Sequence, residues 1–105
     1  MAGTLDNLNC KVFAEHLHTH FKIHTGDGAT LLLELIAVRE GESSPKIEMF
    51  ALTFLGPQTP RLDQKIYPFE HDKLGTFNLF LTAIGADPAG ILYEVVFNRF
   101  RKPQA

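Results

Sequence analysis

With 105 residues the chain has the length of one domain, and its 45% hydrophobic and 21% charged residues suffice for a core and exclude a largely disordered chain. The formal net charge is −2 and basic residues are scattered, apart from Arg99, Arg101 and Lys102, which argues against the dense basic face of a nucleic-acid-binding protein. No apolar run approaches the roughly 20 residues that cross a membrane, and the first residues lack a basic cluster followed by an apolar stretch. We therefore expect no signal peptide, no membrane association and a cytoplasmic location.

A short helix is expected near the start of the chain, over about residues 7–17. Asp6 or Asn7 can cap it, because both residue types accept hydrogen bonds from the free N–H groups of a first helical turn. Spacings of four and one then place four apolar residues on one helical face: Leu8, Val12, Phe13 and Leu17.

From Thr19 onward the hydrophobic period changes to two, which predicts β-strands. Six such stretches are separated by turn residues: 19–24, 30–39, 49–55, 65–71, 76–84 and 91–100. Pro68 lies inside the fourth stretch and has no N–H to donate, which indicates an edge strand or a bulge. Such an edge could add a strand from a partner protein.

Together these elements predict one domain over residues 1–105, with the helix, a β core over about 19–100 and a short basic C-terminal tail. The short connections favour hairpins and therefore an antiparallel meander. Apolar residues on both sides of several strands favour closure of the sheet. The expected fold is mainly β, a small six-stranded antiparallel barrel or sandwich with one short N-terminal helix.

Three stretches carry a resemblance to a known family: Leu62-x-Gln64-x-x-Tyr67-x-Phe69-x-His71-x-x-Leu74-Gly75-x-Phe77-x-Leu79-Phe80-Leu81, Tyr93-Glu94-Val95-Val96-Phe97-Asn98-Arg99 and Phe50-x-Leu52-x-Phe54-x-Gly56-Pro57. Over about residues 8–99 the chain resembles a family of bacterial domains of unknown function, DUF6916. Family members tend to have Gly before the first strand, where His18 stands here. The resemblance implies a bacterial source and a compact β domain but supplies no activity. Relatives are encoded beside proteins that resemble phage tail collars, which implies an association with tail-like structures.

The polar positions of these motifs are the candidate binding residues: Gln64, Tyr67, His71, Glu94, Asn98 and Arg99. Glu94 and Asn98 share one strand face, so a half-buried polar cluster with Tyr67 or His71 is expected. Buried polar groups must find partners, and a structural hydrogen-bond network is therefore favoured over a ligand site.

A histidine cluster is the one group that resembles metal ligands: His16, His18, His20 and His24. Residues two apart on a strand face the same way and could converge on zinc or nickel, but the predicted junction of helix and strand falls inside the run. Solvated surface histidines are favoured, with no metal or other cofactor. Cys10, the single cysteine, is expected to be a packed thiol rather than a nucleophile.

No catalytic motif emerges from the sequence, so we expect a protein that is not an enzyme. The leading hypothesis is a non-catalytic interaction or assembly module of a bacterial complex, with a protein partner or self-association. One alternative is a small β-barrel that carries an apolar ligand. Another is a metal-binding protein or enzyme that uses the histidine cluster.

Overall fold

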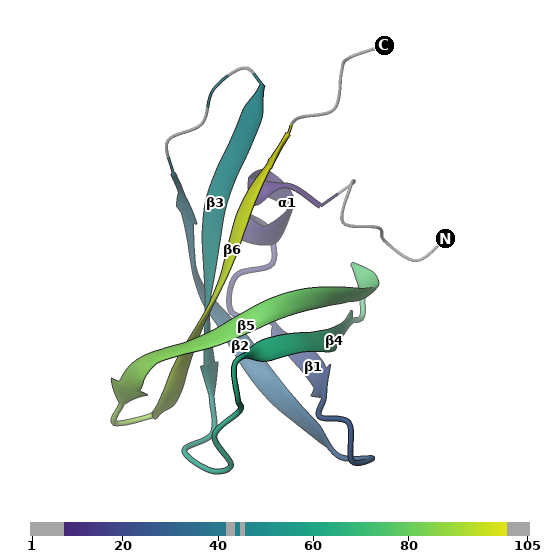
Figure 1. Cartoon of the computed structure of the whole chain (residues 1–105), viewed down its shortest axis with the longest axis vertical. Helices are drawn as coiled ribbons and strands as arrows, with labels where there is room; N and C mark the ends of the chain where they lie inside the picture. Colours follow the sequence, from purple (N-terminus) through teal and green to yellow (C-terminus); the bar gives the residue numbers. More distant parts are fainter. Residues whose placement is uncertain (1–7, 42–43, 45, 101–105) are drawn as a thin grey trace.

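The alternating hydrophobic residues form six antiparallel strands in the computed structural model of the chain (Figure 1). The structure describes residues 8–41, 44 and 46–100. Its elements are α1 (Cys10–Ala14), β1 (His20–His24), β2 (Thr30–Glu40), β3 (Ile47–Gly56), β4 (Lys65–His71), β5 (Gly75–Asp87) and β6 (Gly90–Phe100). The predicted class, mainly β and antiparallel with one short helix, is confirmed. No helix among these residues has the length and apolar character needed to span a membrane.

The strands close into a ring in the order β1-β2-β3-β6-β5-β4, which is the order of a closed barrel. The prediction of a single meander is wrong, because β3 pairs with β6 and β4 pairs with β1. The connection after β3 contains Pro57 and Pro60, which cannot donate to a neighbouring strand, so β4 does not return beside β3. Leu62, buried in this connection, donates its N–H to the Tyr93 hydroxyl at 2.9 Å. The result is two three-stranded meanders joined along β3 and β6.

Closure between β1 and β4 is brief. It consists of the pairs Lys22↔Glu70 and Ile23↔Phe69. Pro68 follows immediately on β4, where the missing N–H ends the ladder. Pro68 therefore does mark an open edge toward β1, although β4 pairs with β5 along its whole length.

Helix α1 is shorter than expected and begins later. Asn9 caps it by accepting the N–H of Val12 at 2.9 Å. The helix ends at Ala14, so Leu17 lies beyond it and is exposed. A short helix suffices to complete the core, because Phe13 is the single helical residue that is fully buried. The predicted caps Asp6 and Asn7, and the predicted basic tail after residue 100, lie outside the described residues.

The chain reverses between α1 and β1 through His18, whose φ is +67°. This is the left-handed region, which glycine enters without cost and other residues rarely adopt. His18 donates its N–H to the Leu35 carbonyl at 2.7 Å, which fixes the turn onto β2. Gly would meet this backbone demand without strain, and His18 meets it here.

Phenylalanines fill the inside of the ring. Fully or nearly fully buried rings come from the helix and from all strands but β2: Phe13, Phe21, Phe50, Phe54, Phe69, Phe77, Phe97, Tyr67 and Tyr93. Phe50 and Phe97 stack with their ring centroids 4.4 Å apart, across the β3–β6 pair. The alternation of inward and outward residues predicted for 91–100 is confirmed by buried Tyr93, Val95 and Phe97.

Candidate functional site

Strands β5 and β6 form a hairpin that pairs for only half its length. Their ladder runs from Asp87↔Gly90 to Thr82↔Glu94 and then stops. Beyond this point residues 75–81 of β5 pair with β4, and residues 95–100 of β6 pair with β3. In Figure 1 the two strands leave their shared turn and diverge, with β6 rising toward the C-terminus and β5 crossing the molecule. We call this opening the β5–β6 split.

Helix α1 holds the split open from inside the ring. The Phe13 ring has its centroid 6.3 Å from that of Phe77 on β5 and 5.7 Å from that of Phe97 on β6. Phe13 also contacts Phe21 and Phe50 at 6.4 and 6.0 Å. A side chain that packs on residues of both strands beyond their last pair, Thr82↔Glu94, acts as a wedge. The helix thus completes the core while keeping the two strands from pairing further.

The outside of the split is a groove of about 370 Å³ that is lined by both strands. Its lining residues are Asn78, Leu79 and Phe80 of β5 and Val95, Val96, Phe97, Asn98 and Arg99 of β6. If the ladder continued in the same register, Phe80 would face Val96 and Asn78 would face Asn98. Instead Phe80 is 49% and Val96 59% exposed, and Phe100 at the end of β6 is 81% exposed.

A second hollow of about 240 Å³ continues this surface across β3 toward β2. Val96 borders both hollows, and Ala51 and Met49 of β3 line the second one. Large apolar side chains exposed side by side over strands are typical of interaction surfaces.

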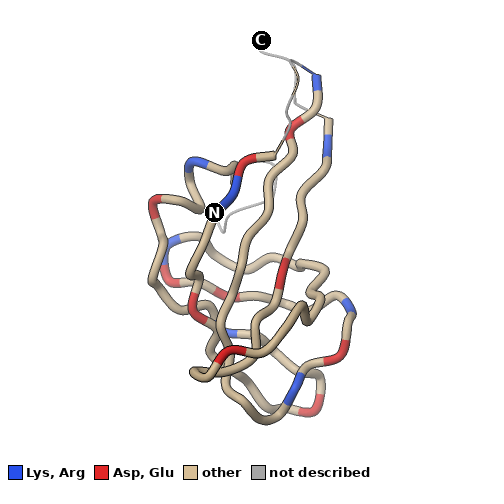
Figure 2. Tube along the Cα trace, turned by 90° about the vertical axis from the view of Figure 1, so that its left-hand side faces the viewer, with Lys and Arg blue, Asp and Glu red and all other residues tan. Residues whose placement is uncertain are grey.

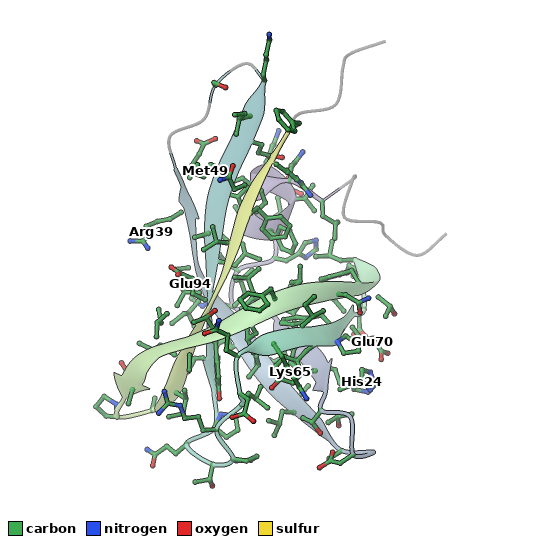
Figure 3. The ribbon with its side chains drawn as sticks, in the orientation of Figure 1. His24, Arg39, Met49, Lys65, Glu70 and Glu94 are labelled. Carbon is green, nitrogen blue, oxygen red and sulfur yellow. The ribbon has the colours of Figure 1, made fainter. Side chains whose placement is uncertain are left out.

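The charged groups around the groove are already paired. Arg39 on β2 lies 3.8 Å from the Glu94 carboxylate across β3, and Figure 3 shows both side chains on the same outer side of the sheet. Arg99 lies 3.2 Å from the Glu48 carboxylate and donates to the Leu8 carbonyl. Along the described part of the trace, acidic and basic residues are interspersed (Figure 2). The groove itself is therefore close to neutral.

Arg99 ties the start of the described chain to the end of β6. Its guanidinium carbon lies 5.0 Å from the centroid of the Phe97 ring and 5.8 Å from that of Phe50. Together with the Glu48 and Leu8 contacts, this stacking holds Leu8 against the core. The motif arginine thus makes contacts within the fold, with Glu48, Leu8 and two phenylalanine rings.

His71 is the buried polar group of the core, at 6% exposure. Its Nδ1 accepts the backbone N–H groups of Lys73 and Leu74 at 3.0 and 3.3 Å. Because Nδ1 faces two donors, the ring proton must be on Nε2, which lies 2.9 Å from the Thr19 hydroxyl. Thr19 in turn donates to the His16 carbonyl at 2.6 Å. One neutral imidazole thus connects the β4–β5 turn to the segment before β1.

Burial, and then the nearby His16, lowers the pKa of His71 from its ordinary value of 6.5. The His16 and His71 rings lie 5.0 Å apart, so a positive charge on the His16 ring disfavours protonation of His71. A proton on Nδ1 would also face the backbone N–H groups of Lys73 and Leu74, and both hydrogen bonds would be lost. The histidine is therefore held neutral by its structural bonds.

The expected cluster of Glu94 and Asn98 with Tyr67 or His71 does not form. Glu94 and Asn98 point outward, whereas Tyr67 and His71 point into the ring and are buried. Tyr67 donates its hydroxyl to the Asp63 carbonyl at 2.7 Å. The cluster fails because the outward residues of β6 and the inward residues of β4 lie on opposite surfaces of one sheet. Gln64 is exposed before β4, and Asn98 lies in the groove.

The four candidate metal ligands do not converge. His18 lies 3.2 Å from the Glu34 carboxylate, and His24 lies 3.1 Å from that of Glu70 (Figure 3). His16 packs on His71, and His20 is exposed on β1. Within the described ranges, no three His, Cys, Asp or Glu side chains are placed to hold a metal ion.

Within the part of the chain that the structure describes, the neighbours of Cys10 disfavour its ionisation. Burial, followed by the charges of Glu40 and Glu48, raises the pKa of its thiol above the ordinary 9.0. The reactive thiolate is therefore disfavoured at neutral pH, in contrast to the lowered pKa of catalytic cysteines.

Sequence reasoning missed the β5–β6 split. The available signal was Phe80 and Val96, large apolar residues on the outward side of their strands. Their outward direction follows from the strand period, but their common position depends on the register of the β5–β6 hairpin, which the turn region alone does not fix.

The chain belongs to a family described as a domain of unknown function, DUF6916, whose model matches residues 8–97. No curated protein and no solved structure matches the chain.

Proposed function

We propose that this DUF6916 domain is a non-catalytic interaction or assembly module that binds a protein partner over the β5–β6 split. The observation that carries the proposal is the neutral groove bordered by exposed Phe80 and Val96. A surface of this kind is costly to leave in water and gains free energy when a partner covers it.

The proposal includes a bacterial source, a cytoplasmic location and membership of a complex associated with tail-like structures. The family resemblance supports the first and the last of these. The single cysteine supports a reducing compartment, since the chain does without an internal disulfide.

The two alternatives have less support. A ligand carrier needs interior space, but the inside of the ring holds tightly packed aromatic rings such as the stacked pair Phe50 and Phe97. A metal enzyme needs convergent ligands, whereas His18 and His24 pair with separate glutamates on the surface.

Site-specific photo-crosslinking tests the proposal. A photoreactive phenylalanine analogue replaces Val96 in one variant and Ile66 in a control, since Ile66 is 63% exposed on β4 and outside the groove. Irradiation in an extract of the source bacterium should give a discrete protein adduct from position 96 and none from position 66. Equal labelling from both positions, or no adduct from position 96, would contradict the proposal.

A further inference from the structure

We infer that His71 is a pH-sensitive switch for closure of the ring: its neutral form holds β4 to the start of β1, and its protonation favours parting of these two strands. The place of parting is the β1–β4 seam, by which we mean the pairs Lys22↔Glu70 and Ile23↔Phe69. This switch works whether or not a partner covers the β5–β6 split.

The β1–β4 seam has the shortest ladder of the ring. It consists of two residue pairs, whereas β4 and β5 share seven and β3 and β6 share ten. If the ladder continued past Lys22↔Glu70 in the same register, Phe21 would come opposite His71. Because few main-chain bonds cross this seam, parting β1 from β4 disrupts less of the structure than parting any other pair of neighbouring strands.

His71 joins the two sides where the ladder of the seam ends. On the side of β1, its ring centroid lies 4.4 Å from that of Phe21, and its Nε2 lies 2.9 Å from the Thr19 hydroxyl. On the side of β4, its Nδ1 accepts the backbone N–H groups of Lys73 and Leu74. One neutral imidazole therefore connects the β4–β5 turn to the residues that begin β1.

Protonation makes this arrangement unfavourable. An imidazolium ring carries a proton on both nitrogens and accepts no hydrogen bond, so the bonds from Lys73 and Leu74 are lost. The new charge would also be buried, since His71 is 6% exposed. When the seam parts, both ring nitrogens can donate to water. The protonated ring is therefore more stable in the open state, and a fall in pH shifts the equilibrium toward that state.

The charges around the His71 ring favour its neutral form on balance. Burial lowers the pKa of His71 most, followed by the charge of His16 on the segment before β1, whose ring lies 5.0 Å away. Within the β4–β5 turn, Asp72 raises this pKa and Lys73 lowers it. The closed ring thus resists protonation from both sides of the seam.

The strands that pack on His71 present uncharged residues to it, Phe21 from β1 and Gly75 from β5. At the other end of the seam, His24 on β1 lies 3.1 Å from the Glu70 carboxylate on β4. Protonation of His24 would strengthen this pair and so oppose the switch. Both side chains are nearly half exposed, however, and exposed ion pairs stabilise a fold only weakly.

Amide hydrogen exchange by NMR on the full chain tests the switch. The seam amides are those of Lys73 and Leu74 and those that bond across the β1–β4 seam. Their protection factors should be at least about tenfold below those of the β3–β6 ladder, and dilute urea should change them little, because local opening exposes little surface. From about pH 7.5 to about pH 4.5, these factors should fall at least about threefold. The fall should begin near the ordinary pKa of 6.5 and end at the pKa of folded His71, read from the chemical shift of its ring.

Two variants assign the effect to His71. In His71→Asn the side-chain oxygen can accept the N–H two residues on, that of Lys73, but does not titrate, so the protection of this amide should not depend on pH. His16→Gln removes a charge that lowers the pKa of His71, so the loss of protection should be smaller and should end at a higher pH. The same substitution at His20, exposed on β1, should leave both unchanged.

Four results would overturn the inference. The protection of the seam amides could be independent of pH. It could equal that of the β3–β6 ladder and depend on urea as steeply, which would mean that the seam opens only when the whole domain unfolds. It could fall with pH to the same extent in His71→Asn, which would assign the effect to another group. If His71→Asn does not fold, His16→Gln decides, and a response equal to that of His20→Gln would refute the switch.

Discussion

Truncation of Phe13 to Ala removes the wedge from the centre of the fold. The ring is fully buried and has four phenylalanine neighbours with centroids 5.7 to 6.4 Å away. Loss of such a ring leaves a cavity, and large-to-small substitutions of this type cost about 3–5 kcal/mol. A domain of this size has a total stability of about 5–15 kcal/mol, so one residue of a five-residue helix should carry a large part of it.

Urea denaturation followed by far-ultraviolet circular dichroism measures the effect. Phe13→Leu fills most of the space and should lose no more than about 1.5 kcal/mol. Lys11→Ala, exposed on the same helix, should change the free energy of unfolding by less than about 0.5 kcal/mol. A loss below about 1 kcal/mol for Phe13→Ala would refute the reasoning, because the helix would then be an accessory rather than part of the core.

Three further predictions concern single side chains. The pKa of His71 is lowered in the folded state, so the stability that His71 contributes should be complete above the ordinary value of 6.5. This contribution should decline as the pH falls from 6.5 toward the folded-state pKa. His71→Leu should abolish this part of the pH dependence of the free energy of unfolding, measured by urea titration. At His18, Gly should be tolerated or slightly stabilising in thermal melts, whereas Val should cost about 1–2 kcal/mol because its branched side chain resists a positive φ. Arg99→Met should cost about 1–3 kcal/mol in the same melts by leaving Glu48 without its partner, and a Lys at this position should restore less than half of the loss.

Strand positions could be predicted because each strand repeats its pattern over many residues. The alternation around Phe77, Leu79 and Leu81 specifies both a strand and its inward side, and the structure agrees. The order of the strands around the ring could not be predicted in the same way. The strand order depends on the path of the connection from β3 to β4. This connection is anchored by the hydrogen bond from Leu62 to Tyr93, which joins residues 31 apart in the sequence.

The candidate site could likewise be predicted only in part. The sequence indicates that motif residues such as His71 and Arg99 need hydrogen-bond or ion-pair partners, because a buried polar side chain must be satisfied wherever it lies. Their partners could not be deduced, since Thr19 and Glu48 reach them from other strands or turns. The helix was overextended because Leu17 fits a helical spacing, although the turn at His18 interrupts it.

The central claim is that β5 and β6 part after Thr82↔Glu94, and backbone proton NOEs from the free domain in solution test it most directly. The account predicts cross-strand NOEs between residues near Thr82 and Glu94 and none between Phe80 and Val96 or between Asn78 and Asn98. A continuous series of NOEs through both of those pairs would contradict it.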